Sequence, residues 1–150
     1  MNGRNIVAKC DKCGTRNRIP ENRMRDRPVC GKCRAPLTTT LIYPEYPLNV
    51  NDQSFFNEVV QFPGAAAAFF WAPSCPHCVR MLPVIDELAK QYAGRIKFVK
   101  LVTEQSPATA SRFDVLGVPT LILFKAGRQV NRLFGAIPKE QLEYHLRALL

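Results

Sequence analysis

The sequence has few acidic residues and no long apolar run. Its 150 residues include 12 Asp and Glu against 21 Lys and Arg. A membrane-spanning helix needs roughly 18 to 20 consecutive apolar residues, and no stretch of the chain reaches that length. The first residues, MNGRNIVAKCDKC, also lack the apolar core of a secretory signal. These absences predict a cytoplasmic protein that has no membrane partner.

The basic residues and the cysteines are unevenly distributed along the chain. Residues 1–40 carry ten Lys and Arg against three Asp and Glu, a formal charge of +7, whereas residues 41–150 carry eleven against nine, a charge of +2. The six cysteines form three CxxC pairs, two in the first segment and one in the second. In a reducing compartment such cysteines are more often metal ligands or redox catalysts than structural disulfides. We therefore expect two domains, 1–40 and 41–150, with different chemistry.

The first segment has the cysteine spacing of a structural zinc site. Its pairs CDKC and CGKC are separated by 16 residues, and two such pairs can supply four thiolates to one tetrahedral ion. Few apolar side chains lie between the pairs, so the segment needs a metal to fold. Structural zinc contributes on the order of 10 kcal/mol to such folding. The predicted ligands of one structural Zn²⁺ are Cys10, Cys13, Cys30 and Cys33.

Two alternatives stay open for this segment. The four cysteines could instead form two disulfides or stay as free thiols. Five arginines, at positions 16, 18, 23, 25 and 27, are compatible with a ribbon that binds nucleic acid. However, few aromatic residues lie among them to stack on bases, so nucleic acid is not the partner that we expect.

The second segment alternates between strand and helix patterns. The runs AAAAFFW at 65–71 and IKFVKLV at 96–102 predict strands, and TLILFKAGRQVNRLFG at 120–135 predicts a hairpin that turns at Ala126 and Gly127. Helical periodicity covers 50–60, 78–93, 106–117 and 138–150, with Ser106 as the expected cap of the third helix. A short edge strand is expected in the proline-rich stretch 34–49. This order predicts an α/β fold, a central mixed sheet flanked by helices on both faces.

The third cysteine pair, CPHC, lies where the apolar strand meets a helix. Free backbone N–H groups and the positive end of the helix dipole favour an anion there, so we expect Cys75 to be a nucleophilic thiolate. Cys78 lies one turn further on, about 5 to 6 Å away, which suits a disulfide. Cys75 would attack a substrate disulfide, and the more sheltered Cys78 would resolve the mixed disulfide.

The alternative interpretation of this pair is half of a second metal site. Such a site needs two further ligands, and no cysteine follows position 78. The candidates are His77 and His145, but His145 is expected on the solvated face of the last helix. Redox chemistry is therefore the preferred interpretation.

Several motifs occur in an order that resembles a known family. They are FFWAPSCPHC at 69–78, the helix residue Pro83, GVPT at 117–120, FKAG at 124–127 and FGAIPKEQL at 134–142. Together they resemble the thioredoxin family over about residues 45–150. With two zinc-binding pairs ahead of that domain, the chain is similar to the bacterial thioredoxin 2 group. The resemblance implies a thioredoxin fold preceded by a small zinc ribbon, protein-disulfide reductase activity, disulfide-containing protein substrates, a reductant such as thioredoxin reductase, and no organic cofactor.

The resemblance also assigns roles to individual residues. Pro119 matches the family's cis-proline, which faces the dithiol, and Val118 would pair through its backbone with an extended substrate segment. Trp71 matches the active-site tryptophan. Gly117 and Gly135 match positions near the substrate groove, where a small residue allows close backbone approach.

Two departures from the family pattern bear on the chemistry. Pro76-His77 replaces the usual Gly-Pro and matches the dipeptide of periplasmic oxidases; His77 would stabilise the thiolate and so make the pair a stronger oxidant. Phe69 replaces the family's buried aspartate, so Lys100 lacks its partner and the proton of the resolving cysteine needs another acceptor.

The sequence therefore predicts a thiol-disulfide oxidoreductase, a protein-disulfide reductase that is less reducing than a standard thioredoxin. One alternative is a zinc-dependent redox-sensing module that binds a partner protein or nucleic acid. Another is a disulfide oxidase or isomerase, which only the inner dipeptide favours.

Overall fold

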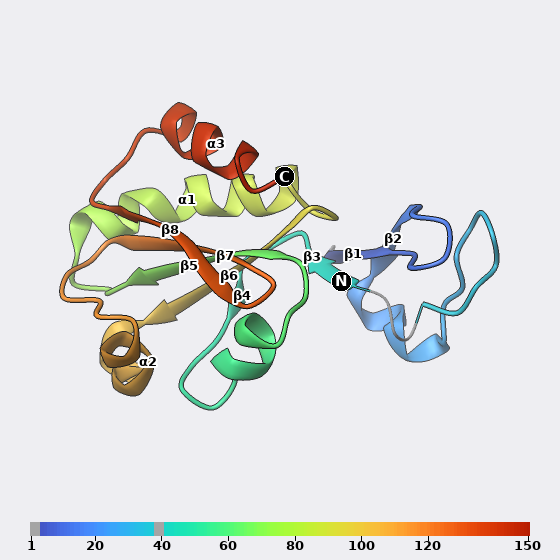
Figure 1. The fold of residues 1–150 in the computed structure, drawn as a ribbon, viewed down its shortest axis with the longest axis horizontal. Helices are drawn as coiled ribbons and strands as arrows, with labels where there is room; N and C mark the ends of the chain where they lie inside the picture. The colour runs from blue at the N-terminus through green and yellow to red at the C-terminus, as the bar shows by residue number, and fades with distance from the viewer. Residues whose placement is uncertain (1–3, 38–40) are drawn as a thin grey trace.

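The computed structural model describes residues 4–37 and 41–150, which form two neighbouring β-sheets (Figure 1). The N-terminal sheet is antiparallel, in the order β2-β1-β3. Its strands are β1 (Asn5–Lys9), β2 (Arg16–Pro20) and β3 (Leu41–Pro44), and the 3-10 helix η1 (Glu21–Asp26) follows β2. β3 lies beyond residue 40, in the second predicted domain, yet its strand partner is β1.

The larger sheet is mixed, as the sequence predicts. Its order is β4-β6-β5-β7-β8. The strands are β4 (Leu48–Asn49), β5 (Ala65–Trp71), β6 (Ile96–Val102), β7 (Thr120–Lys125) and β8 (Arg128–Phe134). β6 runs parallel to both β4 and β5, whereas β7 is antiparallel to β5 and β8 is antiparallel to β7. β4 is the short edge strand expected in the proline-rich stretch.

Helices cover both faces of this sheet, which confirms the predicted fold class (Figure 1). α1 (Pro76–Gln91) and α3 (Lys139–Arg147) lie on one face. α2 (Pro107–Arg112) and the π-helix η2 (Phe56–Val60) lie on the other, and the short 3-10 helix η3 (Thr103–Gln105) precedes α2. Within the described residues, no helix has both the length and the apolar character to cross a membrane.

Strand β5 is buried on both faces because its side chains alternate between two cores. One core contains α1 and α3 and takes Ala65, Ala67 and Phe69. The other contains η2 and takes Ala66, Ala68 and Phe70. The continuous apolar run at 65–71 therefore forms the central strand of the larger sheet, and Cys75 follows its end after three further residues.

Two helix predictions differ from the structure. The helix expected over 50–60 is a single π-helical turn of five residues. Asn51 caps this segment, since its Oδ1 accepts the N–H groups of Gln53 and Ser54. These bonds hold residues 52–54 in a turn, so the helical segment begins only after it, although it ends at Val60 as expected. The third helix is also shorter than the expected 106–117, because it ends at Arg112.

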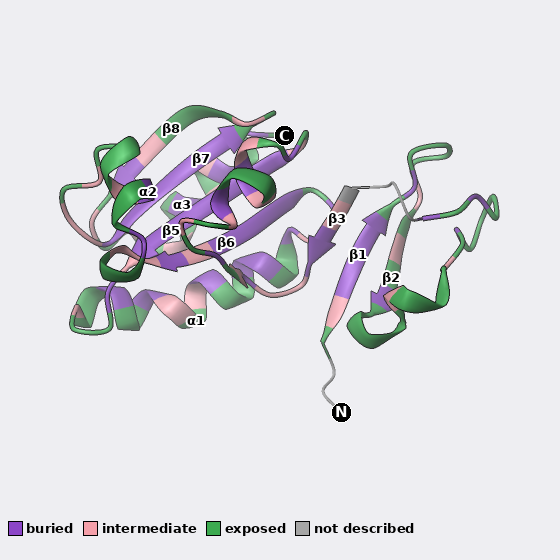
Figure 2. Ribbon diagram, turned by 90° about the horizontal axis from the view of Figure 1, so that it is seen from below, coloured by how far each residue is buried: buried purple, intermediate pink, exposed green. Residues whose placement is uncertain are grey.

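The N-terminal sheet packs directly against the larger one. Along β1, Val7 joins the core that contains η2, together with Tyr43 of β3. The neighbouring Ile6 and Ala8 point the other way, into a separate small core around Cys10 and Cys30. β1 is consequently buried along most of its length between β2 and β3 (Figure 2).

Candidate active site and metal centre

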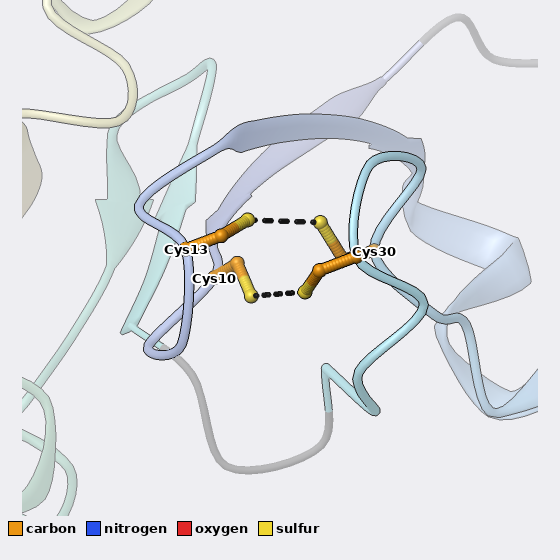
Figure 3. Close-up of side chains that lie close together, drawn as sticks. Cys10, Cys13 and Cys30 are labelled. Carbon is orange, nitrogen blue, oxygen red and sulfur yellow. Dashed lines mark hydrogen bonds between the residues drawn. The ribbon is translucent and has the colours of Figure 1, made fainter.

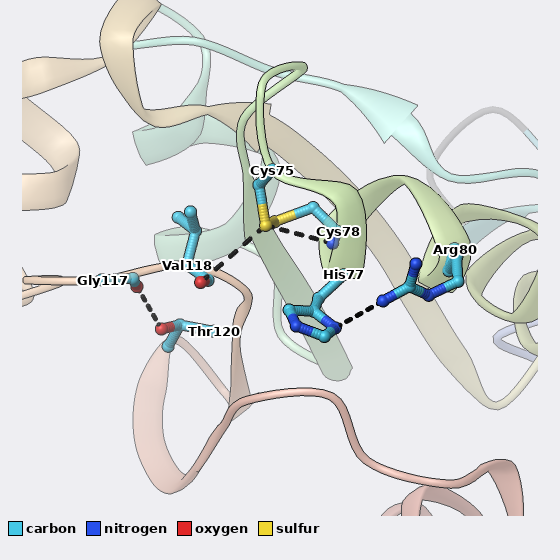
Figure 4. Close-up of a disulfide and its surroundings, with 7 residues drawn as sticks. All are labelled: Cys75, His77, Cys78, Arg80, Gly117, Val118 and Thr120. Atoms are coloured by element: carbon cyan, nitrogen blue, oxygen red, sulfur yellow. Dashed lines mark hydrogen bonds between the residues drawn. A yellow bond between two sulfur atoms is a disulfide. The ribbon is translucent and has the colours of Figure 1, made fainter.

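Cys75 is the N-cap of α1 (Figure 4). Its backbone is extended, with φ −99° and ψ 107°, so its side chain turns back over the first helical turn. The Sγ atom accepts the backbone N–H of Cys78 at 3.1 Å, and the carbonyl accepts the N–H of Val79 at 3.0 Å. A sulfur at this position faces the free amides and the positive end of the helix dipole, which stabilise negative charge.

Cys75 and Cys78 are joined by a disulfide, with their Cα atoms 5.2 Å apart. Cys78 is fully buried, whereas Cys75 is only partly buried. A thiolate of another molecule that attacks this disulfide from solvent therefore reaches Cys75 more easily than Cys78. The predicted i, i+3 pairing is present in the structure.

The loop before β7 lies across from the disulfide. The Val118–Pro119 peptide bond is cis, as the resemblance implies. The carbonyl oxygen of Val118 lies 3.9 Å from Cys75 Sγ. The Thr120 hydroxyl donates to the Gly117 carbonyl at 2.7 Å and so closes the turn (Figure 4). Backbone polar groups of this loop thus lie next to the sulfur that is accessible to solvent.

His77 is exposed, and its ring Nδ1 lies 2.7 Å from a guanidinium nitrogen of Arg80. Arginine can only donate, so Nδ1 is the acceptor and carries no proton in this contact. The His77 ring thus accepts a hydrogen bond from Arg80, one turn further along α1, whereas the Cys75 sulfur accepts the amide of Cys78. A direct bond from His77 to Cys75 remains a prediction for the reduced protein.

Gly135 contacts the loop before β7, whereas Trp71 lies at the end of β5. Gly135 has a φ of +93°, and its N–H donates to the Pro119 carbonyl at 2.9 Å. The Trp71 indole packs against the core on the α1 side, and its Nε1 is buried without a hydrogen-bond partner among the described residues. The Lys100 ammonium lies 6.0 Å from the centroid of the Trp71 ring. The residue after β8 is thereby bonded to the loop beside the disulfide.

Two apolar residues beside the loop before β7, Leu116 and Phe134, were not predicted from the sequence to belong to the site. A Cβ atom on Gly117 would sit 3.0 Å from the Phe134 ring, so this ring lies over the glycine backbone. Phe134 is 67% exposed and Leu116 is 97% exposed. Their only sequence signal is position, because each directly precedes a glycine that the family resemblance placed at the groove.

Phe69 occupies a fully buried position in β5, one residue from the Phe70 that faces the opposite core. Lys100 is its register partner on β6. Within the described part of the chain, no carboxylate lies within ion-pair distance of Lys100. Where the family has a buried carboxylate, this chain thus has an apolar side chain that packs in the core against α1.

The four N-terminal cysteines lie on two loops, one between β1 and β2 and one after η1, and Figure 3 shows Cys10 and Cys13 of the first loop facing Cys30 of the second. Their Sγ atoms all lie within 4.8 Å of one another. The closest approaches cross between the pairs, 3.6 Å from Cys10 to Cys33 and 3.5 Å from Cys13 to Cys30. Tetrahedral zinc with bonds near 2.3 Å requires sulfurs about 3.8 Å apart, so the cluster fits this ion. Among the described residues it is the only group of three or more candidate ligands, and Cys75 and Cys78 lie outside it.

The two cysteine pairs adopt matching turns. The N–H of Gly14 donates to the Cys10 carbonyl, and the N–H of Arg34 donates to the Cys30 carbonyl, both at 2.9 Å. Gly14 has φ +78° and Arg34 has φ +66°. The left-handed conformation is easy for glycine but costs energy for arginine, so the second turn is the more strained of the two.

Backbone amides also favour the thiolate form of Cys30, which is the form that binds a cation. The N–H of Cys33 and, more weakly, that of Lys32 lower the pKa of the Cys30 thiol to about 6. At Cys33 the amide of Ala35 acts to lower the pKa, but burial and the other three sulfurs outweigh it and raise the pKa to about 11. The cluster therefore favours a thiolate at Cys30 and resists four negative charges unless a cation is bound.

Comparisons with known proteins agree with this geometry. A family model described as Thioredoxin matches residues 46–148, and one described as Thioredoxin 2, N-terminal, matches residues 9–35. The chain is 42% identical over 101 residues to Thioredoxin 1 of Nostoc sp., a match that covers 65% of this chain and 94% of the relative. It is 38% identical over 112 residues to Thioredoxin M4, chloroplastic, of Arabidopsis thaliana, covering 75% of this chain and 58% of the relative. A solved mutant thioredoxin from Halobacterium salinarum NRC-1 aligns with a TM-score of 0.65 and 30% identity, covering 70% of this chain and 91% of that chain.

Proposed function

The chain belongs to the thioredoxin family, and we propose that it is a protein-disulfide reductase that works by dithiol-disulfide exchange through Cys75 and Cys78. The observation that carries the proposal is the position of the Cys75 sulfur. It caps α1, accepts the Cys78 amide at 3.1 Å and is partly exposed, whereas Cys78 is buried. This difference in access supports different roles for the two sulfurs.

In the first step the reduced protein attacks its substrate. The Cys75 thiolate forms a bond to one sulfur of the substrate disulfide, and the other substrate sulfur leaves as a thiolate. The amides at the start of α1 stabilise the attacking anion before the step. The product is a mixed disulfide between Cys75 and the substrate.

In the second step Cys78 releases the substrate. Its thiol loses a proton, its sulfur attacks the Cys75 sulfur, and the substrate leaves as a second thiolate. Two electrons have then passed to the substrate, and the Cys75–Cys78 disulfide is formed. Because Phe69 replaces a buried carboxylate, we propose that the proton passes to water, to His77 or to the departing substrate thiolate.

The substrate segment is proposed to lie in the groove between Trp71, Val118 and Gly135. The Val118 backbone, 3.9 Å from the Cys75 sulfur through its carbonyl, is available to pair with an extended substrate chain. Gly135 leaves room beside it, since a Cβ atom there would meet no atom within 4 Å. Pro119 is proposed to take part in this site beside Val118, as the family resemblance implies.

We further propose a redox potential that is less reducing than that of a standard thioredoxin. The inner dipeptide Pro76-His77 lies in the first turn of α1, where a protonated His77 would add positive charge beside the thiolate. A more stable reduced form makes the disulfide a stronger oxidant. The protein is then re-reduced by a cellular dithiol such as thioredoxin reductase.

The N-terminal ribbon is proposed to hold one structural Zn²⁺ through Cys10, Cys13, Cys30 and Cys33. The mutual distances of the four sulfurs and the lowered pKa of Cys30 support this assignment. Bound zinc supplies folding free energy to a segment whose own core is small. The ribbon residues themselves position the four thiolates and pack Val7 against the larger sheet.

Insulin reduction with dithiothreitol tests the reductase proposal. We expect the wild-type protein to accelerate insulin precipitation and Cys75→Ser to abolish the effect. Cys78→Ser is the matched comparison, because it keeps the nucleophile and should accumulate the mixed disulfide with the substrate. Equal activity of wild-type protein and Cys75→Ser would overturn the proposal.

A further inference from the structure

A cavity of about 630 Å³ lies between the N-terminal ribbon and the larger sheet. The ribbon contributes Lys9 and Arg16 to its wall, and the larger domain contributes Arg95 and Lys125. Ala65, the first residue of β5, also lines the cavity, whereas Cys75 follows the last residue of that strand. The cavity and the disulfide therefore lie at opposite ends of β5.

The four cations of this wall have no acidic partner among the described residues. No acidic side chain from that part of the chain lines the cavity. Within residues 4–37 and 41–150, none of the four cations is in an ion pair with a carboxylate side chain. A terminal carboxylate at Leu150, which also lines the cavity, would balance one of the four charges. All four residues are exposed, so water and salt screen them in part, and their shared sign still favours an anion in the cavity.

Two of the cations are held in place by their surroundings. Gly94 has a φ of +91°, and a Cβ atom on it would lie 2.5 Å from Cδ of Arg16. The Arg16 side chain therefore packs on the turn after α1, in space that only a glycine leaves. The Arg95 guanidinium lies 5.0 Å from the centroid of the Tyr92 ring. This arrangement brings a ribbon cation and a domain cation to one cavity.

We propose that this cavity binds an oligophosphate anion, a short chain of phosphates. Its volume lies in the range of small-molecule sites, and cations on two walls suit an anion whose charge is spread along a chain. Among the described residues, the only aromatic one that lines it is Tyr43, which is 3% exposed and packs edge-on against Phe62. The wall therefore offers no open ring on which a nucleobase could stack, and recognition rests on the phosphates alone.

Such an anion would link the ribbon to the larger domain. Arg16 reaches it from β2 and Arg95 from the turn between α1 and β6. A ligand that contacts both parts stabilises the native state by mass action. The site is independent of the chemistry proposed for Cys75 and Cys78, so either proposal can fail without the other.

Calorimetric titration of the zinc-loaded, oxidised full chain with inorganic tripolyphosphate, in 150 mM KCl, tests this site. We expect saturable binding of one anion per chain. The variant Arg16→Gln/Arg95→Gln should bind at least about tenfold more weakly, because tenfold corresponds to about 1.4 kcal/mol and the loss of even one charge-assisted hydrogen bond costs about that much. The control Arg25→Gln/Arg112→Gln removes the same charge from exposed positions of the same two parts and should change the affinity by less than about threefold.

Three results would overturn the proposal: absence of saturable binding to the wild type, equal weakening by the control, or a stoichiometry well above one. Circular dichroism and zinc content check that the cavity variant is folded. If the cavity variant is not folded, the single variant Lys125→Gln, at the exposed end of β7, replaces it in the test and must weaken binding. ATP should bind with the same affinity as tripolyphosphate. Tighter binding of ATP, or of a single-stranded oligonucleotide, would contradict recognition by phosphates alone.

Discussion

The Asp52 carboxylate caps a helix that lies far along the chain. Its oxygens accept the N–H groups of Ala108 and Thr109 and the Thr109 hydroxyl, at 3.2, 2.8 and 2.7 Å. Ser106 was expected to cap this helix, but its hydroxyl makes no cap hydrogen bond and is buried without a partner among the described residues. The free amides of α2 are therefore satisfied by the segment before η2 and not by the residue that precedes the helix.

Replacing Asp52 with alanine should destabilise the protein by roughly 1 kcal/mol, the usual cost of losing a helix cap. Partial desolvation acts to raise the pKa of Asp52, but the hydrogen bonds from Thr109 and Ala108 outweigh it and hold the pKa below its ordinary value. The stabilisation is therefore complete above about pH 4 and is lost as the pH falls further. Thermal unfolding between pH 2.5 and 7 should show wild-type and variant curves converging at the acidic end. The control Asp86→Ala should keep the wild-type pH dependence, and a constant gap between wild type and Asp52→Ala would contradict the assignment.

His77 is the residue proposed to make the Cys75–Cys78 couple less reducing. Removing the imidazole in His77→Ala should make the Cys75–Cys78 couple more reducing by on the order of 30 mV, a tenfold change in its equilibrium with glutathione. His145→Ala, on the far helix α3, is the matched control and should leave the potential unchanged. A potential that does not move in His77→Ala would mean that the hydrogen bond to Arg80 keeps the ring away from the sulfur.

Among the helices and strands, those set by a short-range pattern of apolar residues are predicted best from the sequence. Strands β5 and β6 have the expected bounds, because unbroken or alternating apolar runs between turn residues allow few other structures. The disulfide pair was predicted because cysteine spacing on a helix fixes its geometry. The Asp52 cap and the Phe134 ring over Gly117 were not predictable, since each depends on a contact between distant segments.

The two cysteine turns of the ribbon offer a matched test of backbone strain. Gly14→Ala places a side chain in a left-handed conformation and should cost roughly 1 to 2 kcal/mol of ribbon stability. Arg34→Gly removes such strain and should be neutral or stabilising by less than about 1 kcal/mol. Urea unfolding of the zinc-loaded protein, followed by the release of zinc to a colorimetric chelator, measures both. A stabilising Gly14→Ala would contradict the turn geometry.

At the scale of the whole molecule, the ribbon is fastened to the larger domain by packing and by polar contacts. Tyr43 packs edge-on against Phe62, with the ring centroids 5.4 Å apart. The Tyr46 hydroxyl donates to Glu21, which links the segment between β3 and β4 to η1. The ribbon nevertheless keeps a core of its own. This small core around Cys10 and Cys30 shares no residue with the two cores of the larger sheet.

Removal of zinc should therefore unfold the ribbon and leave the larger sheet folded. With a high-affinity chelator, we expect amide protons of β1 and β2 to lose protection against hydrogen exchange, while those of β5 and β7 keep it. The thermal unfolding curve should acquire a second, earlier transition. Loss of protection throughout β5 would show that the larger domain depends on the ribbon, and unchanged protection of β1 would show that the metal does not stabilise it.

The rate at which iodoacetamide alkylates Cys75 in the reduced protein is the most direct test of the proposed chemistry. The amide of Cys78 and the α1 dipole favour the thiolate of Cys75, so we expect its rate at pH 7 to exceed that of free cysteine by roughly tenfold or more. The rate should also stay nearly constant as the pH rises from 7 to 9. A rate equal to that of free cysteine, rising steadily over the same range, would contradict the account.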